Sequence, residues 1–110
     1  MAPSERDREA KRVLTTVGAT FAIHLWEDRT RGELWVPTLD QLALALVSDE
    51  FLRIASNNAV DAGQRSFEFR AIVPGTHCVV FEKRMGWKFT AEDRRIFSVI
   101  VSEKSGEEDA

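Results

Sequence analysis

The chain has 110 residues, 44% of them hydrophobic, which suits one compact domain with a single core. Its formal net charge is -3, so it lacks the broad positive field that a phosphate backbone requires, and we expect no nucleic-acid partner. No stretch has the length and apolarity of a membrane span and the polar N-terminus has no signal-peptide core, so we expect no membrane partner and, for the chain as written, a cytoplasmic location.

The two ends of the chain differ in composition from the part between them. Residues 1–12 are highly charged and almost free of apolar side chains, which predicts a flexible N-terminal arm. Residues 103–110 are acidic and predict a disordered tail. The domain is therefore expected over residues 13–102, where Val13, Leu14 and Val17 begin the core.

The first clear strand signal covers residues 20–26. Phe21, Ile23 and Leu25 alternate with Ala22 and His24, the period-two pattern of a strand with one buried face. A polar, glycine-bearing loop follows and is enclosed by two tryptophans, at positions 26 and 35. A recognition role, if the chain has one, is expected to start in this loop.

A second strand is predicted around Leu34 to Val36, and Pro37 restricts it to a sheet edge or ends it. We expect Trp35 to lie in the core. The next segment, residues 38–56, allows two readings. A capping box at residues 38–41 with an apolar stripe at helical spacing favours a helix. Alternation on both sides of the polar break at residues 48–50 allows two short strands instead, and periodicity alone does not decide.

Residues 57–64 have the composition of a loop. They precede a clear strand over residues 65–73, in which Phe67, Phe69 and Ala71 alternate with polar residues. Pro74-Gly75 is a turn dipeptide, and residues 76–83 can form a partner strand, so the pattern predicts a hairpin.

The remaining segments are a second excursion and a last strand. Residues 84–89 carry exposed aromatic side chains, and residues 90–93 could form one helical turn. Residues 95–102 alternate with both faces apolar, typical of a strand that is largely covered. Short strands with regularly spaced turn signals favour an all-β fold, an antiparallel sandwich, which gathers loops at its ends.

The residues that could support catalysis or metal binding do not form a recognised site. His24, His77 and Cys78 lack zinc-ligand spacing, and adjacent strand residues such as His77 and Cys78 point to opposite faces. Cys78 has no second cysteine to pair with and is expected to be a small buried residue. We therefore predict no metal, no cofactor and no enzymatic activity.

Three segments together resemble one family: the loop with Thr30, Gly32 and Trp35, the Gly63 loop with the strand after it, and residues 74–87. Their order and spacing are similar to those of chagasin-type inhibitors of papain-like cysteine peptidases. The resemblance implies an immunoglobulin-like antiparallel β-sandwich of about seven to eight strands. It also implies three loops at one end that enter a peptidase cleft, and a strand-loop-strand over residues 38–56.

The first loop carries the best match. Thr30, Gly32 and Trp35 match the family motif, and the resemblance implies that Thr30 lies over the catalytic cysteine of the peptidase. Arg29, Arg31 and Glu33 replace neutral family residues. We expect the charges of Arg31 and Glu33 to pair across a partner's surface or to stay at the rim, because an unpaired buried charge is costly.

The second loop corresponds to residues 61–63 and keeps Gly63, and the third corresponds to residues 84–87 and keeps Trp87. The implied function is reversible occlusion of a papain-like cysteine peptidase by a monomeric inhibitor. The alternative is a diverged immunoglobulin-like interaction module that no longer inhibits such peptidases. The predicted peptidase-binding residues are Thr30, Arg31, Gly32, Glu33, Gly63, Arg84 and Trp87.

Overall fold

The computed structural model describes residues 10–54 and 61–103. The described chain forms seven strands and one 3-10 turn, η1. Their bounds are β1 (Lys11–Thr16), β2 (Thr20–Asp28), η1 (Arg29–Arg31), β3 (Glu33–Thr38), β4 (Leu44–Arg53), β5 (Ala62–Ala71), β6 (Gly75–Met85) and β7 (Asp93–Ser102). No helix in these residues is long and apolar enough to cross a membrane.

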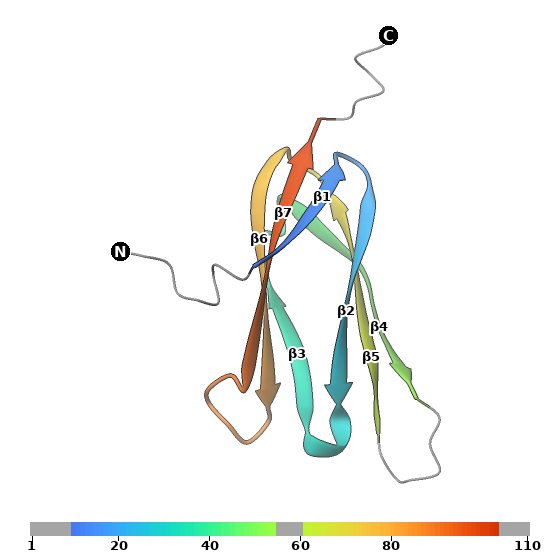
Figure 1. Cartoon of the computed structure of the whole chain (residues 1–110), viewed down its shortest axis with the longest axis vertical. Coiled ribbons are helices and arrows are strands. Elements are labelled where there is room, and N and C mark those ends of the chain that lie inside the picture. The colour runs from blue at the N-terminus through green and yellow to red at the C-terminus, as the bar shows by residue number, and fades with distance from the viewer. Residues whose placement is uncertain (1–9, 55–60, 104–110) are drawn as a thin grey trace.

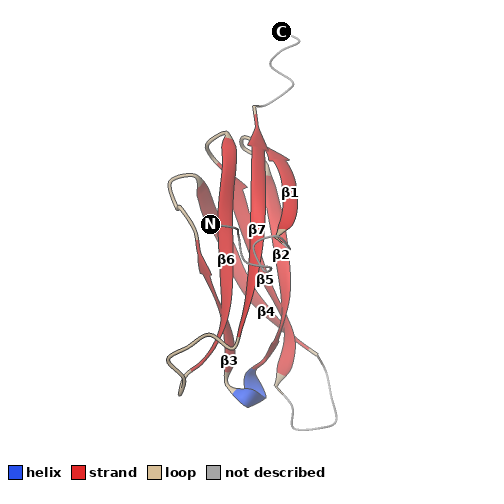
Figure 2. Ribbon diagram, turned by 60° about the vertical axis from the view of Figure 1, so that its left-hand side comes forward, coloured by secondary structure: helices blue, strands red, loops and turns tan. Residues whose placement is uncertain are grey.

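The strands form two sheets that pack face to face (Figures 1 and 2). One sheet has the order β1-β7-β6-β3 and the other has the order β2-β5-β4. All neighbouring strands are antiparallel except β1 and β7, which are parallel. The predicted all-β sandwich is confirmed, with seven strands in the described residues.

The core lies between the sheets and is built from alternate residues of each strand. Phe67 and Phe69 of one sheet and Phe81 of the other have no exposed surface, and Phe81 packs edge to face on Phe97 with ring centroids 5.6 Å apart. Trp35 is 3% exposed, as expected for a core tryptophan. Leu14, however, is 77% exposed, so the prediction that it begins the core is wrong, while Val13 and Val17 pack against the core cluster.

Residues 44–53 form one continuous strand. The helix favoured by propensity is absent, since the capping-box residues give only a turn in which Asp40 accepts the backbone amides of Ala43 and Leu44. The polar break at residues 48–50 is part of β4. A bulge between Leu46 and Ser48 shifts the register, so that Asp49 pairs with Phe67 of β5. The expected strand-loop-strand is therefore wrong, because residues 48–50 belong to the strand and do not form a loop.

The predicted hairpin around Pro74-Gly75 is also wrong. β5 and β6 lie in different sheets, and the chain crosses between them at residues 72–74. Both edges of β5 are already occupied, by β2 and β4, and both edges of β6 are occupied by β3 and β7. Local turn chemistry marks the reversal, but strand partners elsewhere in the chain decide the pairing.

Several predicted boundaries move. β1 begins at Lys11, within the expected arm, and β5 begins at Ala62, within the expected loop. Residues 90–93 form no helical turn, and Asp93 already belongs to β7. Cys78 is exposed, contrary to the prediction of a buried thiol. Pro37 stands in the edge strand β3, as predicted. The expectations for residues 1–9, 55–60 and 104–110 lie outside the described residues.

The sheet registers bring three strand connections to one end of the sandwich. β2 ends and β3 begins at η1, β4 ends and β5 begins beside it, and the residues between β6 and β7 lie at the same end (Figure 1). The pairs Asp28–Ala62 and Glu33–Met85 are the last rungs of their ladders at this end. We call this end of the sandwich the loop end.

Candidate functional site at the loop end

The connection between β2 and β3 is a short, closed 3-10 turn. It is shorter than the loop predicted between the two tryptophans, because β2 continues to Asp28 and β3 begins at Glu33. Asp28 caps the start of the turn by accepting the Thr30 backbone amide at 3.0 Å. Gly32 ends it with a left-handed φ of 79° and donates its amide to the Arg29 carbonyl at 3.0 Å. A glycine suits this position because side chains disfavour a positive φ.

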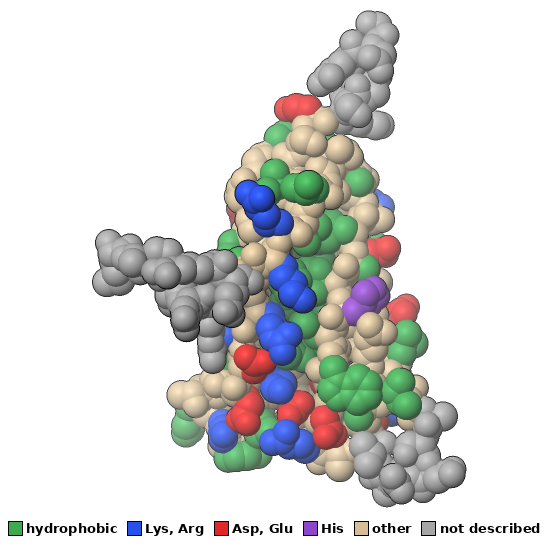
Figure 3. Space-filling view, in the orientation of Figure 1, with side chains coloured by type: hydrophobic (Ala, Val, Ile, Leu, Met, Phe, Trp, Pro, Cys, Tyr) green, Lys and Arg blue, Asp and Glu red, His purple; other side chains and the backbone are tan. Residues whose placement is uncertain are grey.

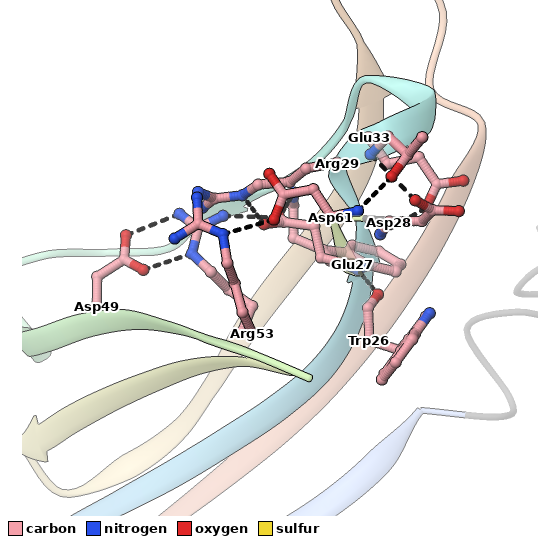
Figure 4. Close-up of polar contacts among 11 residues, drawn as sticks. Trp26, Glu27, Asp28, Arg29, Glu33, Asp49, Arg53 and Asp61 are labelled. Carbon is pink, nitrogen blue, oxygen red and sulfur yellow. Dashed lines mark hydrogen bonds and ion pairs between the residues drawn. The ribbon is translucent and has the colours of Figure 1, made fainter. Parts of the chain in front are cut away.

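The turn is also bonded to the residue that precedes β5. The carbonyl of Asp61 accepts the backbone amides of Arg29 and Thr30 at 2.8 and 3.2 Å. In return, the amide of Asp61 donates to the Thr30 hydroxyl oxygen at 2.5 Å. The side chain of Asp61 pairs with Arg53 at the end of β4 (Figure 4). The first and second connections therefore share one set of hydrogen bonds and form a joined surface.

Glu27 supports this surface from inside the sandwich. Its side chain has no exposed surface, and it accepts the Trp35 backbone amide at 2.8 Å. It also accepts Arg29 Nε at 2.9 Å and an Arg65 guanidinium nitrogen at 2.7 Å (Figure 4). A buried carboxylate is costly unless it is paired and hydrogen-bonded, and Glu27 meets both conditions. The carboxylate thus ties η1, β3 and β5 together.

Arg65 extends the network to β4. Its guanidinium makes two hydrogen bonds to Asp49, one of them from a terminal nitrogen at 2.8 Å, and lies 4.6 Å from the centroid of Phe67. These bonds and the positive charge lower the pKa of Asp49, although partial burial opposes the shift. Arg29 lies 3.9 Å from the centroid of Phe51 in the same layer. Two arginines thus balance two carboxylates beneath the loop end.

The charges of Arg31 and Glu33 are satisfied within the chain. Glu33 is 2% exposed and accepts the Asp28 backbone amide at 3.2 Å. Its carboxylate lies 3.1 Å from an Arg31 guanidinium nitrogen and 3.7 Å from the Lys83 ammonium. A partner is therefore not needed to neutralise Glu33. The Arg31 side chain is more than half exposed while it pairs with Glu33.

Gly63 lies in β5 and is buried. The reason for a glycine here is therefore the packing of its backbone, and not an exposed position in a loop. A Cβ built at this position would lie 2.0 Å from the carbonyl oxygen of Leu52 in β4. The absence of a side chain allows β4 and β5 to approach closely beside Asp61. Gly63 therefore shapes the second connection without facing outward.

The connection between β6 and β7 presents two large aromatic side chains. Trp87 is 71% exposed and Phe89 is 98% exposed. Arg84 donates to the Phe89 carbonyl at 2.9 Å, and Lys88 pairs with Glu92 at 2.8 Å while lying 5.0 Å from the Trp87 ring centroid. The hydrogen bond from Lys88 and its charge lower the pKa of Glu92. The two aromatic side chains are therefore exposed on a loop that is held by a hydrogen bond from Arg84 and by an ion pair between Lys88 and Glu92.

Glu27, Arg65 and Asp49 are the site residues that were not predicted from the sequence, whereas Asp61 lies within the predicted second loop, residues 61–63. Glu27 has the same parity as Ile23 and Leu25, so the strand pattern already placed a carboxylate on the inner face. Arg65 has the parity of Phe67 and Phe69 on the partner strand. Two opposite charges at inward positions of adjacent strands were the available signal. Nothing in the sequence signalled the bulge in β4 that lets Asp49 reach Arg65.

The fold is an immunoglobulin-like β-sandwich in which η1 and Asp61 form one joined surface, and the connection between β6 and β7 lies at the same end (Figure 1). A family model for the chagasin family of peptidase inhibitors, I42, matches residues 15–101, so the chain belongs to this family. A comparison with curated proteins found no match. The expected family and fold are therefore confirmed.

Solved structures show the same fold at low sequence identity. The chain is similar to the cysteine protease inhibitor EhICP2 of Entamoeba histolytica, with 15% identity, a TM-score of 0.73, and 86% of this chain and 90% of that chain covered. It is similar to amebosin, with 19% identity, a TM-score of 0.62 and coverage of 84% and 88%. It is also similar to PbICP-C in its complex with falcipain-2, with 12% identity, a TM-score of 0.59 and coverage of 86% and 91%.

Proposed function

We propose that the chain inhibits papain-like cysteine peptidases by placing its loop end in the active-site cleft. The observation that carries this proposal is the joined surface made by η1 and Asp61, in a chain that belongs to a family of peptidase inhibitors. The falcipain-2 complex of a similar structure supports a cysteine peptidase as the target class. Occlusion needs shape and rigidity and no reacting group.

Thr30 is exposed and lies in the middle of η1, the first connection. Its hydroxyl oxygen accepts the Asp61 amide, which leaves the hydroxyl proton available to donate to a partner. The turn around it is fixed by its two caps and by Asp61, so little conformational entropy is lost on binding. We assign to Thr30 and Gly32 the central contact with the cleft and to Arg31 a contact at its rim.

Trp87 supplies the apolar anchor of the third connection. Tryptophan buries a large area at low entropy cost and is enriched among the residues that dominate binding energy. Arg84 holds the loop through the Phe89 carbonyl, so its role is to position the aromatic residues. Glu33 and Gly63 are buried, and we assign them supporting roles beneath the surface.

The test is inhibition of a panel of papain-like peptidases by the purified chain, with a serine peptidase as the control enzyme. The proposal predicts reversible inhibition that is competitive with substrate for at least one cysteine peptidase. Trp87→Ser should weaken inhibition about tenfold or more, while Leu14→Thr, on the exposed surface of β1, should not. A chain that binds a protein partner but inhibits no peptidase of the panel would favour the diverged interaction module.

A further inference from the structure

The outer face of the β2-β5-β4 sheet carries an apolar patch next to the loop end. Trp26, Leu52 and Ile54 are 57%, 56% and 55% exposed. Trp26 and Leu52 both pair with Gln64, and the Ile54 amide donates to the carbonyl of Ala62 at 2.9 Å. We call Trp26, Leu52 and Ile54, with Gln64 and Ala62 between them, the outer patch.

Strand alternation places these side chains on the face that points away from the core. Leu25 and Glu27, which flank Trp26, are buried between the sheets. Space-filling side chains show hydrophobic groups gathered on this side of the molecule over the lower part of β2 (Figure 3). Exposed apolar side chains that gather in this way mark binding surfaces more often than isolated ones do.

The patch is confined to the part of the sheet nearest the loop end. The next rows along the same outer face consist of polar or small residues, namely His24, Ser66 and Glu50, then Ala22, Glu68 and Ser48, then Thr20, Arg70 and Ala45. Trp26 is two residues from Asp28, about 7 Å along the strand, and Asp28 caps η1. The three apolar side chains therefore adjoin the loop end, and the paired rows beyond them on this face are polar or small.

Trp26 is held in place by the same structure that supports the first connection. Its carbonyl accepts the indole Nε1 of Trp35 at 2.7 Å, and its neighbour Glu27 is the centre of the buried network (Figure 4). The backbone beneath the patch is thus rigid relative to η1. A partner bound to the turn meets the patch at a fixed position.

We propose that the outer patch is a second contact surface for the inhibited peptidase and binds an apolar area on the wall beside its cleft. This inference rests on the proposed function. Three side chains that are about half exposed supply on the order of 300 Å² of surface, well below the roughly 800 Å² per partner of a stable interface. The patch therefore serves as an extension of the loop end and is too small to bind a second copy of the chain by itself.

The experiment measures the inhibition constants of Trp26→Thr and Leu52→Thr for a peptidase that the wild-type chain inhibits. Leu14→Thr is the matched control, because it also replaces an exposed apolar strand residue but lies outside the loop end. The inference predicts inhibition constants about tenfold higher for Trp26→Thr and about threefold higher for Leu52→Thr, with Leu14→Thr within about twofold of wild type. Equal melting temperatures of the variants and the wild type show that folding is preserved.

Wild-type inhibition with unchanged constants in both patch variants overturns this inference and leaves the proposed function standing. A wild-type chain that elutes as a dimer in size-exclusion chromatography, and a Trp26→Thr variant that elutes as a monomer with an unchanged inhibition constant, also overturn it. A wild-type chain that inhibits no peptidase overturns the proposed function, and the inference with it. The three failures are therefore distinguishable.

Discussion

The backbone amide of Asp61 donates to the hydroxyl oxygen of Thr30, so two connections 31 residues apart in sequence act as one surface. Resemblance alone assigned Thr30 a contact with the peptidase. The structure adds a second role within the chain, because the hydroxyl keeps the first and second connections in a fixed arrangement. The two roles can be separated experimentally.

Replacing Thr30 tests this coupling. Thr30→Ala removes the acceptor of the Asp61 amide, and we expect faster hydrogen exchange at that amide and a roughly tenfold weaker inhibition. Thr30→Ser keeps the hydroxyl and should stay close to wild type in both measurements. Slow exchange at Asp61 in Thr30→Ala would show that the hydroxyl does not hold the two connections together.

Glu27 is predicted to be essential for stability. Glu27→Ala leaves two arginines and the Trp35 amide without their shared acceptor, and breaking a buried ion pair in this way costs about 3 to 5 kcal/mol. For a domain of this size the melting temperature should fall by roughly 12 °C or more. Calorimetry measures the change, with Glu68→Ala on the outer face as the control. A fall of only a few degrees would mean that the network contributes little.

Alanine should be far more destabilising at Gly63 than at Gly86. Gly63→Ala places a methyl group against the Leu52 carbonyl and should destabilise the fold by about 2 to 3 kcal/mol or more. At Gly86 nothing lies within 4 Å of an added Cβ, so Gly86→Ala should change the free energy of unfolding by less than about 0.5 kcal/mol. Chemical denaturation of both variants tests the difference. Equal stability of the two would contradict the close approach of β4 and β5.

Acid should weaken the fold through Asp49. Arg65 lowers the folded-state pKa of this carboxylate, so its stabilising contribution is present above the unfolded pKa of about 3.9 and is lost as the pH falls through the lower folded value. Asp49→Asn should melt below wild type at about pH 7, and the gap should close under acid, below about pH 4. Melting curves over this range give the comparison. A gap that stays constant with pH would remove Asp49 as its cause.

The sequence predicted those parts of the fold that alternation alone determines. The strands with Ile23, Phe67 and Val99 at their inward positions were predicted, because period two reports directly which side chains are buried. The partners of β5 and the bulge at Val47 were not, because both depend on residues distant in sequence. Cys78 was misplaced although alternation gives its face, since Val79 and Phe81 point to the core and Cys78 therefore points away from it.

The candidate site was only partly predictable. Thr30, Gly32 and Trp87 were found because they match a motif, and they are the exposed or turn-forming residues of the loop end. Glu33 and Gly63 match positions near the loops, yet both are buried. The network around Glu27 was missed because the inward positions of Glu27 and Arg65 become informative only when β2 and β5 are known to be neighbours. The residues that we propose to contact a target could be recognised by motif, whereas the residues that support them could be identified only from the fold.

Competition for the peptidase cleft tests most directly whether the loop end occludes it. Binding of the wild-type chain to a cysteine peptidase that it inhibits is measured with the cleft empty and with the cleft filled by a covalently attached peptide blocker. Occlusion of the cleft by the loop end predicts tight binding to the empty enzyme and binding at least about a hundredfold weaker to the blocked enzyme. Equal binding to both forms would contradict occlusion of the cleft by the loop end.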